Sequence, residues 1–351
     1  MNKITSLLGI RYPVIGGPML GVTTPEMVAA VSNSGGLGSL PIGGLAPDAA
    51  RELIKKTASL TSAPWAVNLF AQNIPAQIDE TALMSMQDYL EEYTKQRGLP
   101  FTKRGVGEFR FYSHREQVDV LLEEDVRIVS FTFGVLAEDV IRRLKRRGVV
   151  LMGTATSVAE AGVLEESGID VVVAQGYEAG GHRGSFLEPD LPQVGLFALL
   201  PQVADAVGVP VIAAGGIVDA RTIRAAFQLG ASGVQAGTLF VPSAESAANE
   251  GYKDAVVSAR DTDTQLTRAF SGRWARGIRN EFMQNIEASG IALPEYNVHN
   301  SLTAGLRAHG RKTDRPEVVS LWAGQHAGKA RKGGVAEIFS NLVEGIDFDA
   351  L

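Results

Sequence analysis

Short apolar runs alternate with amphipathic stretches along most of this 351-residue chain. Eight of these runs have the length and composition of buried strands, and each is bounded by turn-forming residues. They lie near residues 13–17, 37–40, 65–69, 127–132, 149–153, 170–174, 210–214 and 233–236. Strands that alternate with helices pair in parallel, and eight such strands can close into a barrel. We therefore predict an α/β fold, a (β/α)8 TIM barrel.

The intervening helices carry start and stop signals. A capping residue precedes each helix and a glycine follows it: Thr24 (with Pro25) and Gly35, Ser157 (in a capping box with Glu160) and Gly168, and Asp219 and Gly230. The stretch 135–147 has apolar residues on one side and a basic cluster elsewhere, which indicates a solvated outer face rather than a binding patch.

Two segments interrupt the alternation. Residues 74–125 are too long for one crossover helix, and they contain a polar, partly helical piece and a piece rich in Gly, Arg and Phe. Residues 242–315 follow the eighth strand and look largely helical. We expect both insertions to pack together as a mainly helical subdomain over one barrel mouth. The barrel then comprises residues 1–73, 126–241 and 316–351, with a final outer helix within 330–345.

Composition disfavours several classes of protein. The net charge of −6 argues against a nucleic-acid partner or an anionic membrane surface. The absence of cysteine removes disulfides, thiolate chemistry and iron–sulfur clusters, and it fits a reducing cytoplasm. We see no apolar segment long enough to span a membrane, no signal peptide and no histidine spacing typical of a metal site, so we expect a cytoplasmic protein without a metal.

The run 174–184 opens a glycine-rich loop directly after the sixth strand. Gly180 and Gly181 allow the backbone to approach a ligand closely, because glycine has no Cβ. His182 adds a side chain whose ordinary pKa suits proton transfer near neutrality. The alternative is a histidine that only fixes the loop. In a barrel of this kind, the ends of the strands form the active site, so this loop is a candidate catalytic loop.

Two further loops offer backbone N–H groups for a phosphate. Gly215 and Gly216 follow the seventh strand, and Gly237 and Thr238 follow the eighth. These donors, together with the N-terminus of the helix capped by Asp219, can converge on an anion. Ordinary tight turns are the alternative, since they also favour glycine.

Two amide side chains lie at strand ends. Asn68 is on the third strand and Gln175 ends the sixth, and each offers donors and an acceptor that suit the edge of a heterocycle. Each amide could instead bond neighbouring loop backbone.

These motifs together resemble the nitronate monooxygenase family, formerly called 2-nitropropane dioxygenases. The run 174–184 carries the most specific match, and further blocks match in order at 17–19, 68–70, 130–134, 214–217, 235–238 and 322–325. The resemblance covers nearly the whole chain and implies a TIM barrel that holds FMN non-covalently. It implies that His182 is the catalytic base. The implied FMN-binding residues are Met19, Asn68, Gln175, Gly180, Gly181, Gly215, Gly216, Gln235, Ala236, Gly237, Thr238, Trp322 and Gln325.

The family implies oxidation of an alkyl nitronate by FMN and O₂ to a carbonyl compound and nitrite, with propionate 3-nitronate as a plausible toxic substrate. A protonated His182 would orient the nitronate, whereas a neutral one would remove the α-proton of a nitroalkane. Phe70, Phe131, Phe133 and Trp322 could form an apolar wall, or plain core packing. The resemblance leaves a homodimer open.

Other functions remain as alternatives. FMN-dependent NADH:quinone reductases and enoyl-acyl-carrier-protein reductases share similar blocks, although a long 242–315 insertion over the mouth would exclude nicotinamide or a carrier protein. A non-redox phosphate-binding barrel and a non-catalytic flavin carrier are the remaining candidates.

Overall fold

The computed structural model describes residues 2–187 and 190–351, and its centre is an eight-stranded parallel sheet. The strands follow the order β1-β9-β8-β6-β5-β4-β3-β2 around the sheet. Their bounds are β1 (Val14–Gly16), β2 (Gly38–Pro41), β3 (Trp65–Phe70), β4 (Ile128–Thr132), β5 (Val150–Ala155), β6 (Val171–Gln175), β8 (Val211–Ala214) and β9 (Gly233–Ala236). All eight strands predicted from the sequence are confirmed, each within two residues at either end.

The sheet closes on itself between β1 and β2. Leu37, just before β2, forms a parallel bridge with Ile15. The Gly16 amide donates to the Leu37 carbonyl at 2.9 Å, and the Leu37 amide donates to the Val14 carbonyl at 3.0 Å. Because the ring of strands is complete, the predicted TIM barrel is confirmed.

Two apolar layers hold the barrel together. Alternate strand residues such as Ile15, Met152 and Ile212 pack inside it, and α1 (Lys3–Leu8) closes this inner layer with Ile4 and Leu8. A larger outer layer lies between the strands and the helices around them. Those helices are α2 (Pro25–Asn33), α3 (Pro47–Leu60), α5 (His114–Glu123), α6 (Glu138–Arg146), α7 (Val158–Glu166), α8 (Leu196–Ala206), α9 (Ala220–Gln228) and α13 (Val335–Val343).

The predicted helix starts are largely confirmed. The Thr24 hydroxyl accepts from the Met27 amide at 3.0 Å, and the Asp219 carboxylate caps α9. Ser157 caps α7, but the predicted capping box is wrong because the carboxylate of Glu160 does not return to Ser157. Glu160 is fully buried and accepts instead from the amide of Thr156 at 2.6 Å and from that of Phe186 at 2.5 Å. It thereby fixes the segment that follows the glycine-rich loop.

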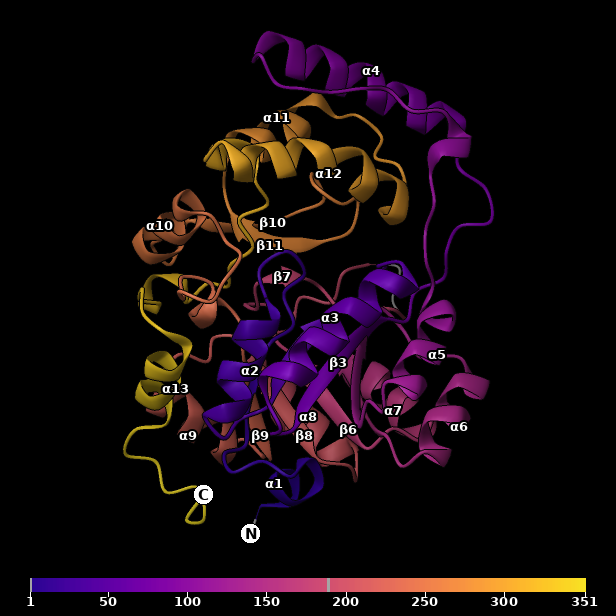
Figure 1. Cartoon of the computed structure of the whole chain (residues 1–351). Helices are drawn as coiled ribbons and strands as arrows, with labels where there is room; N and C mark the ends of the chain where they lie inside the picture. Colours follow the sequence, from indigo (N-terminus) through magenta and orange to yellow (C-terminus); the bar gives the residue numbers. More distant parts are fainter. Residues whose placement is uncertain (1, 188–189) are drawn as a thin grey trace.

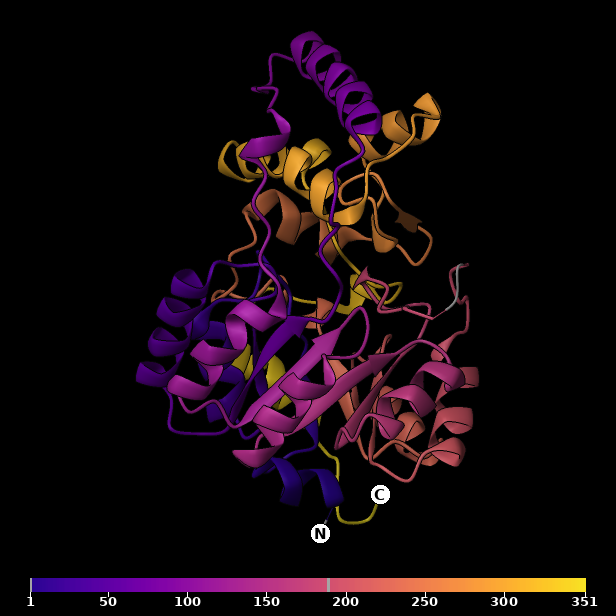
Figure 2. The same cartoon turned by 90° about the vertical axis from the view of Figure 1, so that its right-hand side faces the viewer.

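A second, separate apolar core lies beyond the carboxyl ends of the barrel strands. It is built mainly from α4 (Glu80–Gln96), α11 (Glu281–Ser289) and α12 (Tyr296–Lys312), and we call this region the cap. Figures 1 and 2 show these helices on one side of the barrel. A separate three-stranded sheet lies between them and the barrel (Figure 1). Two of those strands, β10 (Thr264–Thr267) and β11 (Ala275–Ile278), were missed in the segment predicted to be largely helical, which also contains α10 (Glu250–Ser258).

One part of the first insertion differs from expectation. Helix α5 lies within the segment 74–125, yet it packs against α3 and α6 of the barrel rather than in the cap. The reason is its apolar face, because Val118 and Leu121 are fully buried in the outer barrel layer.

Both chain ends lie at the end of the barrel away from the cap (Figure 1). Among the helices in residues 2–187 and 190–351, none combines the length and apolar character needed to cross a membrane.

Candidate active site

His182 lies where the barrel and the cap meet. Together with Gly181 it forms the two-residue strand β7 (Gly181–His182), which pairs antiparallel with β11 of the cap. In this register His182 is opposite Ala275 and Gly181 is opposite Arg276. Part of the predicted glycine-rich loop is therefore a strand, and its pairing with the cap fixes the position of His182.

The imidazole of His182 is enclosed by three aromatic rings and one hydroxyl. The ring centroids of Phe133, Tyr296 and Trp322 lie 5.7, 5.5 and 5.5 Å from that of His182. The Nε2 atom of His182 is 2.8 Å from the Ser271 hydroxyl, which is also 3.1 Å from the carbonyl of Arg273. Since that carbonyl can only accept, we assign the Ser271 proton to it and the His182 proton to Nε2. Nδ1 is then the basic nitrogen.

Burial, together with the positive charges of Arg273 and Arg307, lowers the pKa of His182 to about 3. The imidazole is therefore neutral near pH 7. Of the two roles considered from the sequence, a neutral imidazole is compatible with a proton acceptor and not with a cation that attracts the substrate.

The positive charge comes instead from two arginines of the cap. Arg273 lies over the Phe133 ring, 4.1 Å from its centroid, and its buried Nε has no hydrogen-bond partner. Arg307 donates from Nε to Thr303 and from Nη2 to the carbonyl of Asn300. Burial lowers the pKa of Arg307 to about 10, so it stays charged at neutral pH. In the described part of the chain no carboxylate forms an ion pair with either guanidinium, and the site therefore favours an anion.

Phe133 is held in an unfavourable backbone conformation at the end of β4. Its φ of 73° is in the left-handed region, where a bulky residue pays about 1–2 kcal/mol. The strain places its ring against Phe70, 4.8 Å between centroids, and beside His182. The predicted apolar wall therefore contains Phe70, Phe133 and Trp322. Phe131 belongs to core packing instead, because it is fully buried in the outer barrel layer.

The two predicted amides have internal partners. Asn68 is buried on β3 and donates to the hydroxyl of Ser130 at 2.9 Å. Gln175 donates to the carbonyl of His182 at 3.0 Å and accepts from the amide of Gly184 at 2.9 Å. Gln175 thus holds the glycine-rich loop, and each amide keeps hydrogen-bonding capacity for a ligand.

Of the two predicted phosphate loops, the one after β8 adopts a conformation that requires glycine. Gly215 and Gly216 have φ values of 123° and 69°. Gly237 precedes the 3₁₀ turn η2 (Thr238–Phe240), and Met19 lies beside it, its sulfur 3.5 Å from where a Cβ of Gly237 would be. We call residues 215–216 and 237–238 the cradle. The side chain of Glu178 borders it, with Cγ 3.4 and 3.6 Å from where a Cβ of Gly215 and of Gly216 would be.

The N-terminus of α9 is a less suitable anion site than the sequence suggests. The carboxylate of Asp219 accepts from the amides of Arg221 and Thr222 at 3.1 and 3.2 Å, so it occupies those donors and repels a phosphate. The carboxylate of Glu178 likewise accepts from the Leu196 amide at the start of α8. Of the helical starts next to the cradle, that of η2 is the one at which no side chain forms a capping hydrogen bond.

The tail segment 322–327 connects these loops. A Cβ on Gly180 would lie 2.5 Å from the nitrogen of Gly324, so contact with the tail is enough to require glycine at this position. The Gly324 amide donates to the Thr238 hydroxyl at 3.0 Å, which leaves the hydroxyl proton free to donate. The Gln325 amide donates to the carbonyl of Glu178 at 3.0 Å, while the Gln325 side chain is exposed.

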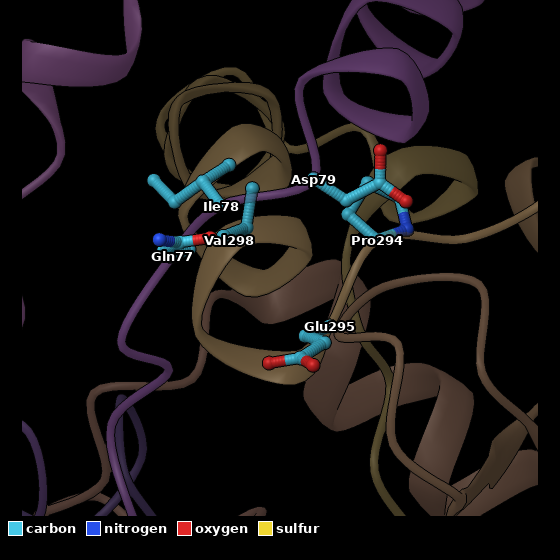
Figure 3. A pocket seen from close by; sticks show the side chains of 6 residues that line it. All are labelled: Gln77, Ile78, Asp79, Pro294, Glu295 and Val298. Atoms are coloured by element: carbon cyan, nitrogen blue, oxygen red, sulfur yellow. The ribbon is translucent and has the colours of Figure 1, made fainter.

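Sequence reasoning missed several residues of this site. Ser271, Arg273, Tyr296 and Arg307 come from the cap, and no motif marks them. The hollow shown in Figure 3 lies where the chain entering α4 crosses the start of α12, and its volume is about 20 Å³. Its lining residues include Asp79, Glu295 and Val298 but not His182, so we assign it no part in the chemistry.

Fold and site together define a TIM-barrel protein in which a barrel histidine lies beside a serine of the cap. The family model for nitronate monooxygenase matches residues 2–345, and the chain belongs to this family. It is 41% identical over 352 residues to a probable nitronate monooxygenase of Staphylococcus aureus strain Newman, covering 99% of this chain and 97% of that protein.

Solved structures agree with this assignment. Nitroalkane oxidase from Streptomyces ansochromogenes superposes with a TM-score of 0.86 at 34% identity, covering 97% of this chain and 96% of that chain. FabK from Thermotoga maritima superposes with a TM-score of 0.76 at 30% identity, covering 98% and 95%. Family membership implies a flavoprotein, and the glycine-rich cradle with the free hydroxyl proton of Thr238 fits a phosphorylated flavin.

Proposed function

We propose that this enzyme oxidises small nitronates with O₂ and bound FMN, giving a carbonyl compound and nitrite. The observation that carries the proposal is a neutral His182 whose pKa is lowered by two nearby arginines, neither of which has a carboxylate partner among the described residues. A nitronate is already an anion, so it needs electrostatic attraction more than deprotonation. The arrangement supplies attraction from Arg273 and Arg307 and a proton acceptor from His182.

Different residues would bind the phosphate and the ring of FMN. The cradle and the Thr238 hydroxyl would bind the phosphate. Asn68, Gln175 and Gln235 would face the ring edge, Met19 and Trp322 would border the ring, and Gly181, Ala236 and Gln325 would flank it. When bound, the flavin supplies the electron transfer between substrate and O₂.

The protein side chains have the remaining tasks. Arg273 and Arg307 raise the local concentration of the anionic substrate and orient it. Phe70, Phe133 and Trp322 exclude water and contact the alkyl chain. Nδ1 of His182 accepts the α-proton when the substrate is a neutral nitroalkane, and otherwise a hydrogen bond.

We further propose a substrate with a second negative group, such as propionate 3-nitronate, and hence a role in detoxification. Two guanidinium groups exceed the need of one nitronate, and Arg273 keeps a buried N–H without a partner. A carboxylate is the group that a guanidinium binds best. The cytoplasm remains the expected compartment on composition.

The first test is anaerobic mixing of the flavin-loaded enzyme with ethyl nitronate and, separately, with NADH, while the flavin spectrum is recorded. Rapid reduction by the nitronate, with nitrite released on admitting air, supports the proposal. Reduction by NADH alone would replace it with an NADH:quinone or enoyl-acyl-carrier-protein reductase.

The arginine role has its own test. We expect Arg307→Met to raise the KM for propionate 3-nitronate by about tenfold or more, because one charged contact contributes about 1.5–3 kcal/mol. The effect on uncharged nitroethane should be much smaller. Arg142→Met, on the exposed face of α6, is the matched control and should leave both KM values unchanged. An equal loss for both substrates would mean that Arg307 acts only in folding the cap.

A further inference from the structure

The tail segment 322–327 contacts every glycine-rich loop of the site. Besides the bonds from Gly324 to Thr238 and from Gln325 to Glu178, Nδ1 of His326 lies 3.1 Å from the carbonyl of Gly216. Glycine at both 180 and 324 is needed for this arrangement, since a Cβ on Gly324 would lie 2.9 Å from the carbonyl of Glu178. The tail therefore fixes the geometry of the cradle from outside the barrel.

The cradle itself supplies backbone donors and one hydroxyl but no charged side chain. The carboxylate of Glu178, whose Cγ borders Gly215 and Gly216, caps the start of α8, and that of Asp219, three residues after Gly216, caps α9. Either carboxylate would repel a phosphate dianion bound close to it. The site thus lacks a positive partner for the phosphate among the residues predicted to bind it.

His326 can supply that charge. The Gly216 carbonyl only accepts, so Nδ1 of His326 carries a proton. Its Nε2 makes no hydrogen bond within residues 2–187 and 190–351, although the ring is partly buried against the cradle. An imidazole that donates from both nitrogens is positively charged, and a hydrogen bond from it to a phosphate is charge-assisted.

We infer that His326 is a ligand of the flavin phosphate, donating from Nε2 while Nδ1 remains on Gly216. The inference rests on FMN being the cofactor, as proposed above. It makes the tail a part of the cofactor site that distinguishes FMN from riboflavin.

The test uses the cofactor-free protein titrated with FMN and with riboflavin, following the quenching of flavin fluorescence. In His326→Asn, the shorter amide retains a donor near the position of Nδ1 and loses the group at Nε2. We expect FMN to bind about tenfold or more weakly, as for the loss of one charge-assisted hydrogen bond, while riboflavin binds within about twofold of the wild type. His326→Gln, whose amide reaches the position of Nε2, should recover part of the FMN affinity.

Phosphorus NMR gives a second measurement, because the resonance of bound FMN should shift between the wild type and His326→Asn. Equal losses for FMN and riboflavin would overturn the inference and leave His326 a purely structural part of the loop. Unchanged FMN affinity in both variants would also overturn it. If the wild type binds neither flavin, the FMN proposal itself fails. If the wild type binds FMN and both variants bind it equally well, only the inference about His326 fails.

Discussion

Gly180→Ala tests whether the contact between the glycine-rich loop and the tail supports the cofactor site. The new Cβ would lie 2.5 Å from the nitrogen of Gly324 and 2.6 Å from the carbonyl carbon of Ala323, both backbone atoms that cannot rotate away. An ordinary contact begins near 3.4 Å, so the tail must retreat by about 0.9 Å. The Gly324–Thr238 and Gln325–Glu178 bonds, both 3.0 Å, would then exceed hydrogen-bonding distance.

Each lost bond costs about 1 kcal/mol, so we expect the variant to be destabilised by about 2 kcal/mol and its FMN affinity to fall by about tenfold or more. Chemical unfolding of the cofactor-free protein and fluorescence titration with FMN measure the two effects. Gly162→Ala is the matched control, because its Cβ would meet no atom within 4 Å on α7 and should be neutral or slightly stabilising. Wild-type stability and FMN affinity in Gly180→Ala would refute the reasoning.

Three further predictions concern the surroundings of His182 and the cap. Ser271→Ala removes the hydrogen-bond partner of His182 Nε2, so kcat/KM for nitroalkanes should fall by about tenfold and the pH profile of kcat/KM should shift. The free energy of unfolding should change by about 1 kcal/mol or less. An unchanged pH profile would contradict the assigned tautomer of His182. Burial lowers the pKa of His299 from 6.5 to about 4, so on acidification the unfolded state takes up the proton before the folded state does. The free energy of unfolding should therefore fall by up to about 3 kcal/mol as the pH is lowered from 6.5 to 4. Urea unfolding across that range should show a flatter dependence in His299→Gln, and parallel curves would exclude this origin. Phe133→Gly relieves the backbone strain but removes a buried ring, and a net loss of about 2 kcal/mol in urea unfolding is expected, whereas a net gain would show that the strain dominates.

The barrel was predictable because each strand carries its own signal. Buried parallel strands are short continuous apolar runs, and glycine or a capping residue marks where each helix ends or begins, as at Gly168 and Asp219. The cofactor loops share this advantage, since the strand ends of such a barrel meet on one face. Membership of the family then implies a flavin cofactor, and this conclusion does not depend on the geometry of the site.

The cap half of the site could not be predicted in the same way. Ser271, Arg273, Tyr296 and Arg307 reach His182 only after two insertions fold around a separate core, and none lies at a strand end of the barrel. Strand β7 has two residues and exists because β11 pairs with it, so no local pattern indicates it. Glu160 is a case in which a sequence signal was present but misleading. Its spacing from Ser157 indicated a capping box, whereas the buried carboxylate accepts hydrogen bonds from the amides of Thr156 and Phe186.

The division of the molecule into two apolar cores has a consequence for inactivation. The histidine is carried by the barrel, while its hydroxyl partner and both arginines are carried by the cap. Partial melting of the cap alone would separate these groups and leave the barrel intact. On gradual heating, turnover should therefore disappear before the barrel unfolds, and cooling should restore it without refolding of the whole chain.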